Sequence, residues 1–185
     1  ATSAGTSVFA STPEVVETNE STKTESSKET AQKVMDQYQK IEGIDSEKTI
    51  LGADFAHYQQ NGGWNKVWKD YKGNAVNNLF SYVKTQGINT ISVKIAVNSG
   101  KDNKYLSLEN AEKTLKEAKK AGLRTNAVLL YSDAMTYANT QNLPDGWTAD
   151  DAGEKAIAYT QATLKALDDD DALPDIVTVG NEVNY

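Results

Sequence analysis

The stretch PDIVTVGNEVNY, residues 174–185, carries the strongest indication of the fold. Its run Ile176–Val179 is short and β-branched, with a proline before it and a glycine after it, a pattern typical of a buried parallel strand. Asn181 and Glu182 would then lie at the carboxyl end of that strand. Parallel α/β folds keep their active sites at this edge, so Glu182 is the first candidate for chemistry.

Strand patterns and helix patterns alternate along the chain before this stretch. Three more strands are predicted, at 50–56, 91–97 and 124–131. Four β/α units in order predict a parallel α/β sheet with right-handed crossovers. The glycine-rich fingerprint of a nucleotide-binding sheet is absent after the first strand, which favours a (β/α)8 TIM barrel over a doubly wound sheet. A complete barrel usually needs about 250 residues, so we expect 49–185 to hold only its first four β/α units.

Apolar residues at helical spacing predict the helices between these strands. The first lies within 74–87 and stops at Gly87. The second begins after Ser107 as N-cap and ends at Gly122. The third opens at a capping box of Thr148 and Asp151 and ends in the acidic run 168–171, which we interpret as a solvated connection.

The first 48 residues are not expected to belong to the barrel. Residues 11–33 are mostly Ser, Thr, Glu and Lys, which cannot offset the entropy cost of ordering, so a disordered tail or linker is predicted there. Residues 34–48 could form a weak helix, and the domain boundary is placed near Thr49, giving domains 1–48 and 49–185. The small-x-small pattern at 8–10 favours a signal-peptide cleavage site and hence a secreted protein; a plain disordered start is the alternative.

Composition excludes several classes of partner and cofactor. A formal net charge of −7 with no basic cluster argues against a nucleic-acid partner. No stretch approaches the roughly 20 apolar residues that a membrane span requires. The chain has no cysteine, and His57 is its single histidine, so neither a disulfide nor a metal site or other cofactor is expected.

Five motifs from Leu51 to the last residue follow a pattern shared with known proteins: GAD at 52–54, KDYKGN at 69–74 leading into NLFSYVKTQGIN at 78–89, KIAVNS at 94–99, YSD at 131–133 with Gln141, Pro144 and Trp147 after it, and VGNEVN at 179–184. By these motifs the sequence resembles glycoside hydrolase family 53, the endo-β-1,4-galactanases, which are retaining enzymes with (β/α)8 barrels.

The resemblance implies a site for β-1,4-galactan. Glu182 matches the family's proton donor, the general acid/base, and Asn181 would donate a hydrogen bond to the sugar 2-hydroxyl. The family's nucleophile comes from the seventh strand, which we expect beyond Tyr185, so this chain alone is expected to be inactive. The remaining substrate-binding candidates are Asp54, Lys94, Asn98, Tyr131, Asp133 and Trp147. For both aspartates a structural role is an open alternative, as core packing is for Tyr131 and loop anchoring for Trp147.

Four departures from the family pattern keep a second function open. Lys94 stands where the family has an arginine, Leu130 where it has a histidine, and Ala96 and Met135 where it has tryptophans. A lysine cannot reproduce the planar fork of an arginine, and lost aromatic platforms weaken sugar stacking. The first hypothesis, which rests on the matching motifs, is a secreted galactanase. The alternative is a non-catalytic carbohydrate-binding protein or degenerate barrel.

Overall fold

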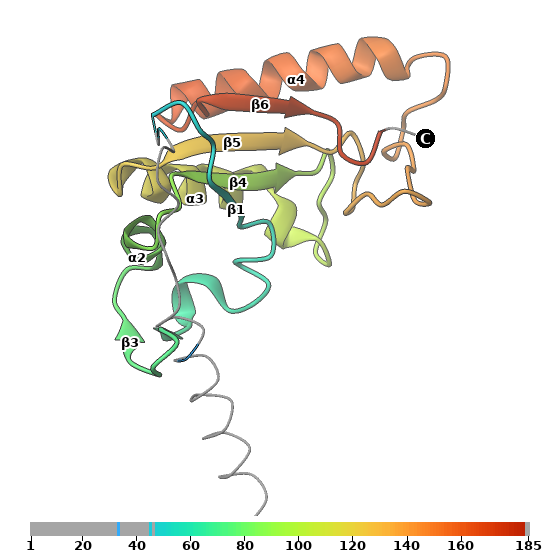
Figure 1. Cartoon of the computed structure of the whole chain (residues 1–185). Helices are drawn as coiled ribbons and strands as arrows, with labels where there is room; N and C mark the ends of the chain where they lie inside the picture. The colour runs from blue at the N-terminus through green and yellow to red at the C-terminus, as the bar shows by residue number, and fades with distance from the viewer. Residues whose placement is uncertain (1–32, 34–44, 46, 184–185) are drawn as a thin grey trace, which may run out of the picture. The chain divides into compact units, whose positions relative to one another are not determined.

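The computed structural model describes residues 33, 45 and 47–183 (Figure 1). The predicted signal-peptide site lies outside these residues, as do almost all of the predicted tail and of the weak helix at 34–48. Those expectations, and the domain boundary near Thr49, stay predictions.

Four parallel strands form the main sheet, as the sequence predicts. They are β1 (Gly52–Asp54), β4 (Thr90–Ile95), β5 (Arg124–Leu129) and β6 (Ile176–Val179), and they are hydrogen-bonded in the order β1-β4-β5-β6. Each strand therefore pairs with the next one along the chain in the sheet, and all four point the same way (Figure 1). This is the arrangement of the first four β/α units of a barrel.

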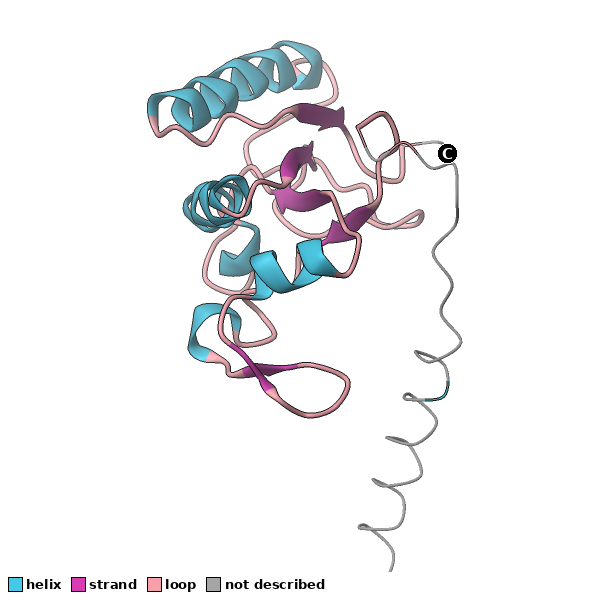
Figure 2. Ribbon diagram, turned by 60° about the vertical axis from the view of Figure 1, so that its left-hand side comes forward, coloured by secondary structure: helices cyan, strands magenta, loops and turns pink. Residues whose placement is uncertain are grey.

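Three helices connect these strands and lie to one side of the sheet (Figure 2). They are α2 (Leu79–Thr85), α3 (Leu108–Lys120) and α4 (Ala152–Asp169). Short 3₁₀ helices, η1 (Gly63–Asn65) and η2 (Lys104–Leu106), lie in the loops before α2 and α3.

The predicted caps are present. The Ser107 hydroxyl accepts a hydrogen bond from the Asn110 backbone N–H at 3.3 Å, which confirms Ser107 as the N-cap of α3. Thr148 and Asp151 form the reciprocal bonds of a capping box, at 2.8 and 3.4 Å. The regular part of α4 begins one residue after Asp151, so the box lies in the turn that leads into the helix.

The sequence patterns did not predict a second, two-stranded sheet, formed by β2 (Trp68–Lys69) and β3 (Ala75–Val76). The residues between these strands belong to a separate unit. There the Asp70 carboxylate accepts backbone N–H groups from Lys72 and Asn74, and the Asn74 side chain also donates to it. This last bond is the main reason why the pKa of Asp70 is lowered.

The helix-facing side of the sheet holds the apolar core. Val93 and Ile95 of β4 and Ala127 and Leu129 of β5 point to this side, and they pack against Ala111 and Leu115 of α3 and Leu167 of α4. A second cluster is aromatic: Tyr58 and Phe80 are buried with Ile91, and Trp64 and Trp68 pack against them.

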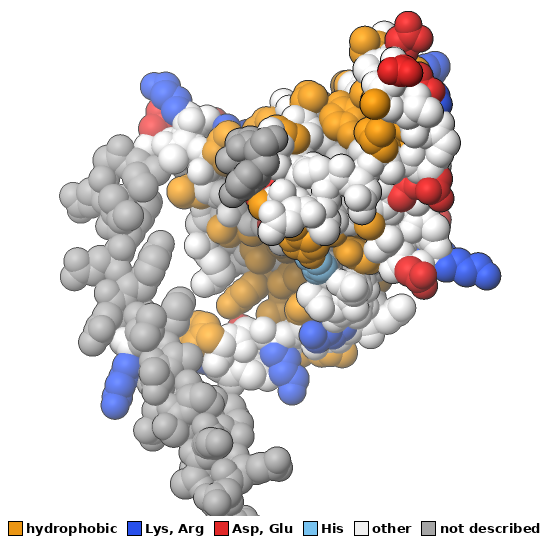
Figure 3. Space-filling view, turned by 90° about the vertical axis from the view of Figure 1, so that its right-hand side faces the viewer, with side chains coloured by type: hydrophobic (Ala, Val, Ile, Leu, Met, Phe, Trp, Pro, Cys, Tyr) orange, Lys and Arg blue, Asp and Glu red, His pale blue; other side chains and the backbone are white. Residues whose placement is uncertain are grey.

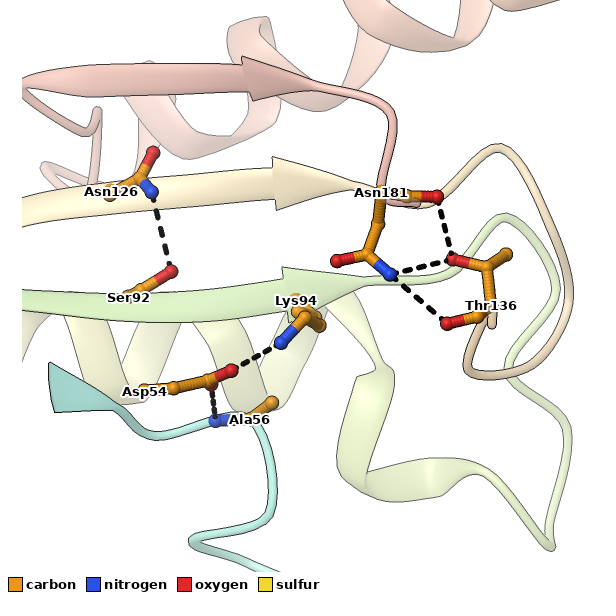
Figure 4. Close-up of polar contacts among 7 residues, drawn as sticks. All are labelled: Asp54, Ala56, Ser92, Lys94, Asn126, Thr136 and Asn181. Carbon is orange, nitrogen blue, oxygen red and sulfur yellow. Dashed lines mark hydrogen bonds and ion pairs between the residues drawn. The ribbon is translucent and has the colours of Figure 1, made fainter. Parts of the chain in front are cut away.

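The opposite face of the sheet carries polar side chains that join the strands. The Asn126 amide donates to the Ser92 hydroxyl at 3.3 Å (Figure 4), and the Thr178 hydroxyl donates to the Asn126 carbonyl oxygen at 3.1 Å. These three residues join β4, β5 and β6 by side chains as well as by backbone. In a closed barrel this face points to the interior, and Lys94 stands on it next to Ser92 in the alternation of β4.

We expect Leu115→Ala to lower the free energy of unfolding by about 2–5 kcal/mol, because it leaves a cavity under the middle of the sheet. Leu115 is fully buried, whereas Ile157 on α4 is 63% exposed, so Ile157→Ala should change the free energy by no more than about 0.5 kcal/mol. Urea titration followed by circular dichroism measures both. Equal effects of the two substitutions would contradict this account of the core.

Candidate active site

The carboxyl ends of the four strands form one edge, which Figure 3 views face-on: hydrophobic side chains line its hollowed centre, and charged side chains lie mostly at the periphery. Backbone pairing continues past the strand ends here. Leu130 N–H donates to the Ile95 carbonyl at 3.0 Å, and Gly180 N–H donates to the Leu129 carbonyl at 3.0 Å. These bonds fix where the loops after β4, β5 and β6 begin relative to one another.

Asp54 and Lys94, both predicted to bind substrate, form an ion pair across β1 and β4 (Figure 4). The other oxygen of Asp54 accepts the Ala56 backbone N–H at 2.7 Å. The Lys94 side chain is only 13% exposed and the Asp54 side chain 50% exposed. The pair therefore places a mostly buried lysine ammonium near the carboxyl ends of β1 and β4, where a carboxylate that water still reaches balances its charge.

Asp133 connects two loops of this edge. One of its oxygens accepts the Asn98 backbone N–H at 2.9 Å, and the other accepts the Asp145 backbone N–H at 2.8 Å. Its own carbonyl accepts the Asn103 side-chain amide at 3.2 Å. Both carboxylate oxygens thus serve the loops, which favours the structural alternative for Asp133. Asn98 lies beside Asp133 because its backbone N–H donates to that carboxylate, and the Asn98 side chain is exposed.

Tyr131 points away from the edge towards α4. Its backbone has a left-handed φ of 50°, and its ring packs edge-on against Tyr159, with ring centroids 5.9 Å apart. Its hydroxyl shares a 2.8 Å hydrogen bond with Thr160. This placement favours core packing over sugar binding. Trp147, in contrast, is half-buried in the loop that leads into α4, and its backbone N–H donates to Pro144 at 3.0 Å.

Asn181 lies just past β6 and is bound to Thr136 of the preceding loop (Figure 4). Its side-chain amide donates to the carbonyl and to the hydroxyl oxygen of Thr136, both at 3.0 Å. The Thr136 hydroxyl in turn donates to the Asn181 carbonyl at 3.3 Å. The amide nitrogen, which the sequence predicts as a donor to a sugar hydroxyl, donates to Thr136 in this structure, and its contact with a sugar stays a prediction.

Glu182 is exposed and has a left-handed backbone, with φ of 59°, which is unusual for a residue other than glycine. The Gln141 side-chain amide stabilises this turn, because it donates to the carbonyl oxygens of Asn181 at 3.1 Å and Glu182 at 2.9 Å. The turn directs the chain away from the strand at the residue predicted to act as the acid/base. Sequence patterns alone could not reveal this contact, because it joins residues 41 positions apart.

Tyr159 of α4 supports the end of β4 from the helix side. Its hydroxyl donates to the carbonyl oxygens of Ile95 at 3.3 Å and Ala96 at 3.2 Å. Burial raises the pKa of this phenol to about 12, because the phenolate would lose its hydration.

Within 47–183, no three His, Cys, Asp or Glu side chains are grouped so that they could hold a metal ion. His57 is exposed and stacks on the ring of Tyr105, with centroids 5.4 Å apart. No helix among the described residues is long and apolar enough to cross a bilayer.

Comparison with known proteins agrees with this geometry. The family model described as glycosyl hydrolase family 53 matches residues 50–185. An arabinogalactan endo-β-1,4-galactanase of Cellvibrio japonicus (strain Ueda107) is 33% identical over 144 residues, which cover 76% of this chain and 38% of that protein.

Solved structures show the same fold. A chain from a study of two fungal β-1,4-galactanases superposes with a TM-score of 0.66 at 29% identity, over 73% of this chain and 40% of that one. The family 53 catalytic domain of Ignisphaera aggregans superposes with a TM-score of 0.68 at 23% identity, over 79% and 42% of the two chains. The chain spans about two fifths of the length of the relatives it matches.

We expect Asp133→Asn to cost about 1–3 kcal/mol of stability, because an amide can accept only one of the two loop N–H groups and turns a donor towards the other. The exposed Asp150 in the same loop provides the control, as Asp150→Asn. Urea unfolding gives the energy, and limited proteolysis reports whether the loops after β4 and β5 open. Unchanged stability and cleavage in Asp133→Asn would contradict the role assigned to this carboxylate.

Tyr159 should make the folded state sensitive to high pH. Below its ordinary pKa of 10.0 the phenol is protonated in both folded and unfolded chains; between about 10 and 12 only the unfolded chain loses the proton, so stability falls as pH rises. Tyr159→Phe should therefore lose less stability than the parent between pH 10 and 12, measured by urea unfolding at each pH. Parallel decline in both proteins would refute the assignment.

Proposed function

This chain belongs to glycosyl hydrolase family 53, and from that membership we propose that it acts as an endo-acting, retaining glycoside hydrolase on β-1,4-galactan, the galactan of plant cell-wall arabinogalactan. The observation that carries the proposal is the position of Glu182. It follows directly on the carboxyl end of β6, on the edge where a (β/α)8 barrel keeps its catalytic residues, and its side chain is exposed there.

Glu182 is proposed as the general acid/base. As the glycosidic bond breaks, the protonated carboxyl of Glu182 gives its proton to the departing sugar oxygen, and the enzyme keeps the other sugar as a covalent ester. In the second step the Glu182 carboxylate takes a proton from water, whose oxygen then attacks the anomeric carbon and releases the ester. Glu182 ends protonated, as it began.

The carboxylate that forms the ester is proposed to lie outside the described residues. A retaining enzyme needs it about 5–5.5 Å from the acid/base. Asp54 and Asp133 are the carboxylates nearest to the other strand ends, but Asp54 pairs with Lys94 and Asp133 accepts two backbone N–H groups. Neither is arranged to attack a sugar, so the described part supplies the acid/base without the nucleophile.

Substrate contacts are proposed for the groups that remain available at this edge. Asn181 offers its Oδ1 to a sugar hydroxyl. Near the ends of β1 and β4, Lys94 offers a donor and Asp54 an acceptor. Asn98 and Trp147 lie on loops that border the edge, where an indole could stack on the apolar face of a galactose ring.

Secretion is part of the same proposal. A polymeric cell-wall galactan does not enter a cell, so its hydrolase must act outside. The small-x-small pattern at 8–10 supports export of the chain.

The alternative, a carbohydrate-binding protein without catalysis, rests on one structural feature. Ala96 and Leu130 are buried in an apolar cluster, and Met135 and Tyr105 pack against it. The positions where the family resemblance leads one to expect aromatic or histidine side chains are therefore filled by aliphatic packing. Fewer platforms for sugar stacking mean that either the subsites differ from those of the family or turnover is poor.

A reducing-sugar assay on β-1,4-galactan separates the two. We expect no turnover by the 185-residue chain, and turnover by a chain extended through any coding sequence that follows Tyr185. In the active form Glu182→Gln should lower kcat on galactan by about 10²–10⁴, because an amide cannot donate the proton. Aryl galactosides with good leaving groups, which need little protonation, should be affected far less.

Glu154→Gln, an exposed glutamate in the first turn of α4, is the matched control and should keep the parent rate. Parent-like activity of Glu182→Gln on galactan would exclude Glu182 as the acid/base. Binding of galacto-oligosaccharides without turnover by any form of the protein would favour the non-catalytic alternative.

A further inference from the structure

We propose that Thr136 is a positioning residue, whose hydroxyl fixes the orientation of the Asn181 side chain at the edge of the barrel. This inference rests on the proposed function, because it assigns Asn181 a sugar hydroxyl as its partner. The geometry points to it through a reciprocal set of hydrogen bonds, which needs a hydroxyl at position 136 and a side-chain amide at position 181.

The Thr136 hydroxyl both donates and accepts in this contact, and the Asn181 side-chain nitrogen donates twice. The Thr136 hydroxyl donates to the Asn181 backbone carbonyl at 3.3 Å and accepts from the Asn181 amide at 3.0 Å. The amide also donates to the Thr136 carbonyl at 3.0 Å. Rotation of the amide by 180° would bring its oxygen against the Thr136 carbonyl, so only one orientation is allowed.

The remaining atom of the Asn181 side chain is Oδ1, which points away from Thr136 (Figure 4). Asn181 therefore presents an acceptor to the edge. A sugar hydroxyl that donates to this oxygen becomes a better donor as positive charge develops on the ring, so the bond strengthens in the transition state. A freely rotating amide would present its donor and its acceptor by turns.

Burial makes the contact rigid. Thr136 is 1% exposed, and Asn181 is half-buried, so water cannot replace the hydroxyl. The loop that carries Thr136 is itself held: Asp133 binds it to Asn98 on one side, and Gln141 binds it to the Asn181 and Glu182 carbonyls on the other. The loop after β5 thus sets the side-chain angle of a residue after β6.

The experiment compares Thr136→Val, Thr136→Ser and Thr140→Val. Valine keeps the shape of threonine without its hydroxyl, serine keeps the hydroxyl, and Thr140 is an exposed threonine of the same loop. The first readout is NMR of the Asn181 side-chain amide in the 185-residue chain: its hydrogen exchange with solvent, and the separation between its two proton signals. It needs no catalysis.

We expect Thr136→Val to speed exchange of this amide by at least about 10-fold, because it alone removes a hydrogen-bond partner of the amide. Thr136→Ser and Thr140→Val should leave the exchange rate within about twofold of the parent. The second readout is galactan hydrolysis by the form of the protein that turns over. There Thr136→Val should lower kcat by about 10-fold with KM within about twofold, since the lost interaction strengthens in the transition state, and Thr136→Ser should restore kcat.

Protected amide protons in Thr136→Val would overturn the proposal. So would a freed amide with unchanged kcat, or a fall in kcat that Thr136→Ser shares. A role limited to stability would lower the melting temperature and the amount of folded protein but leave kcat per folded molecule at the parent value. If neither the 185-residue chain nor its extended form cleaves galactan, the proposed function fails, and the exchange measurement alone decides whether Thr136 orients Asn181.

Discussion

The packing of α3 against β4 and β5 is the interaction on which the rest of this structure depends. Leu115 and Ala111 of α3 fill the space over Val93, Ile95 and Leu129. Because successive strand residues point to opposite faces, burying this set leaves Ser92, Lys94 and Asn126 on the other face, where side-chain hydrogen bonds join the strands. A slip of one residue in register would exchange the two faces, and both the core and the site would be lost together.

The strand register also determines the geometry of the candidate site. Since all four strands are parallel and hydrogen-bonded to their neighbours in chain order, their carboxyl ends meet at one edge. What the register alone does not fix, the loop after β5 does: Asp133 holds the neighbouring loop, Thr136 holds the Asn181 side chain, and Gln141 holds the left-handed turn at Glu182. The candidate acid/base is therefore placed by a strand end and oriented by a loop.

The features predicted from sequence are those set by local patterns. The strand at 176–179 was predicted with its observed bounds, and Ser107 was predicted as a helix cap, because β-branched runs and capping hydroxyls act within a few residues. The unpredicted features depend on distant contacts or on backbone conformation. The left-handed backbone of Tyr131 turns its ring into the core, and the bonds between Thr136 and Asn181 span 45 residues. Neither leaves a periodic signal.

The central claim is that Glu182 is the acid/base of a retaining galactanase, and chemical rescue tests it most directly. In the active form of the protein, Glu182→Ala removes the acid/base but leaves the opposite face of the sugar to the nucleophile. Azide can then enter the space vacated by the glutamate and attack the covalent intermediate without general base assistance. With an aryl β-galactoside as substrate and azide added, the account predicts faster turnover and a β-configured galactosyl azide, identified by NMR. An α-configured azide would make Glu182 the nucleophile instead, and parent-like hydrolysis of β-1,4-galactan by Glu182→Ala would contradict any catalytic role for it.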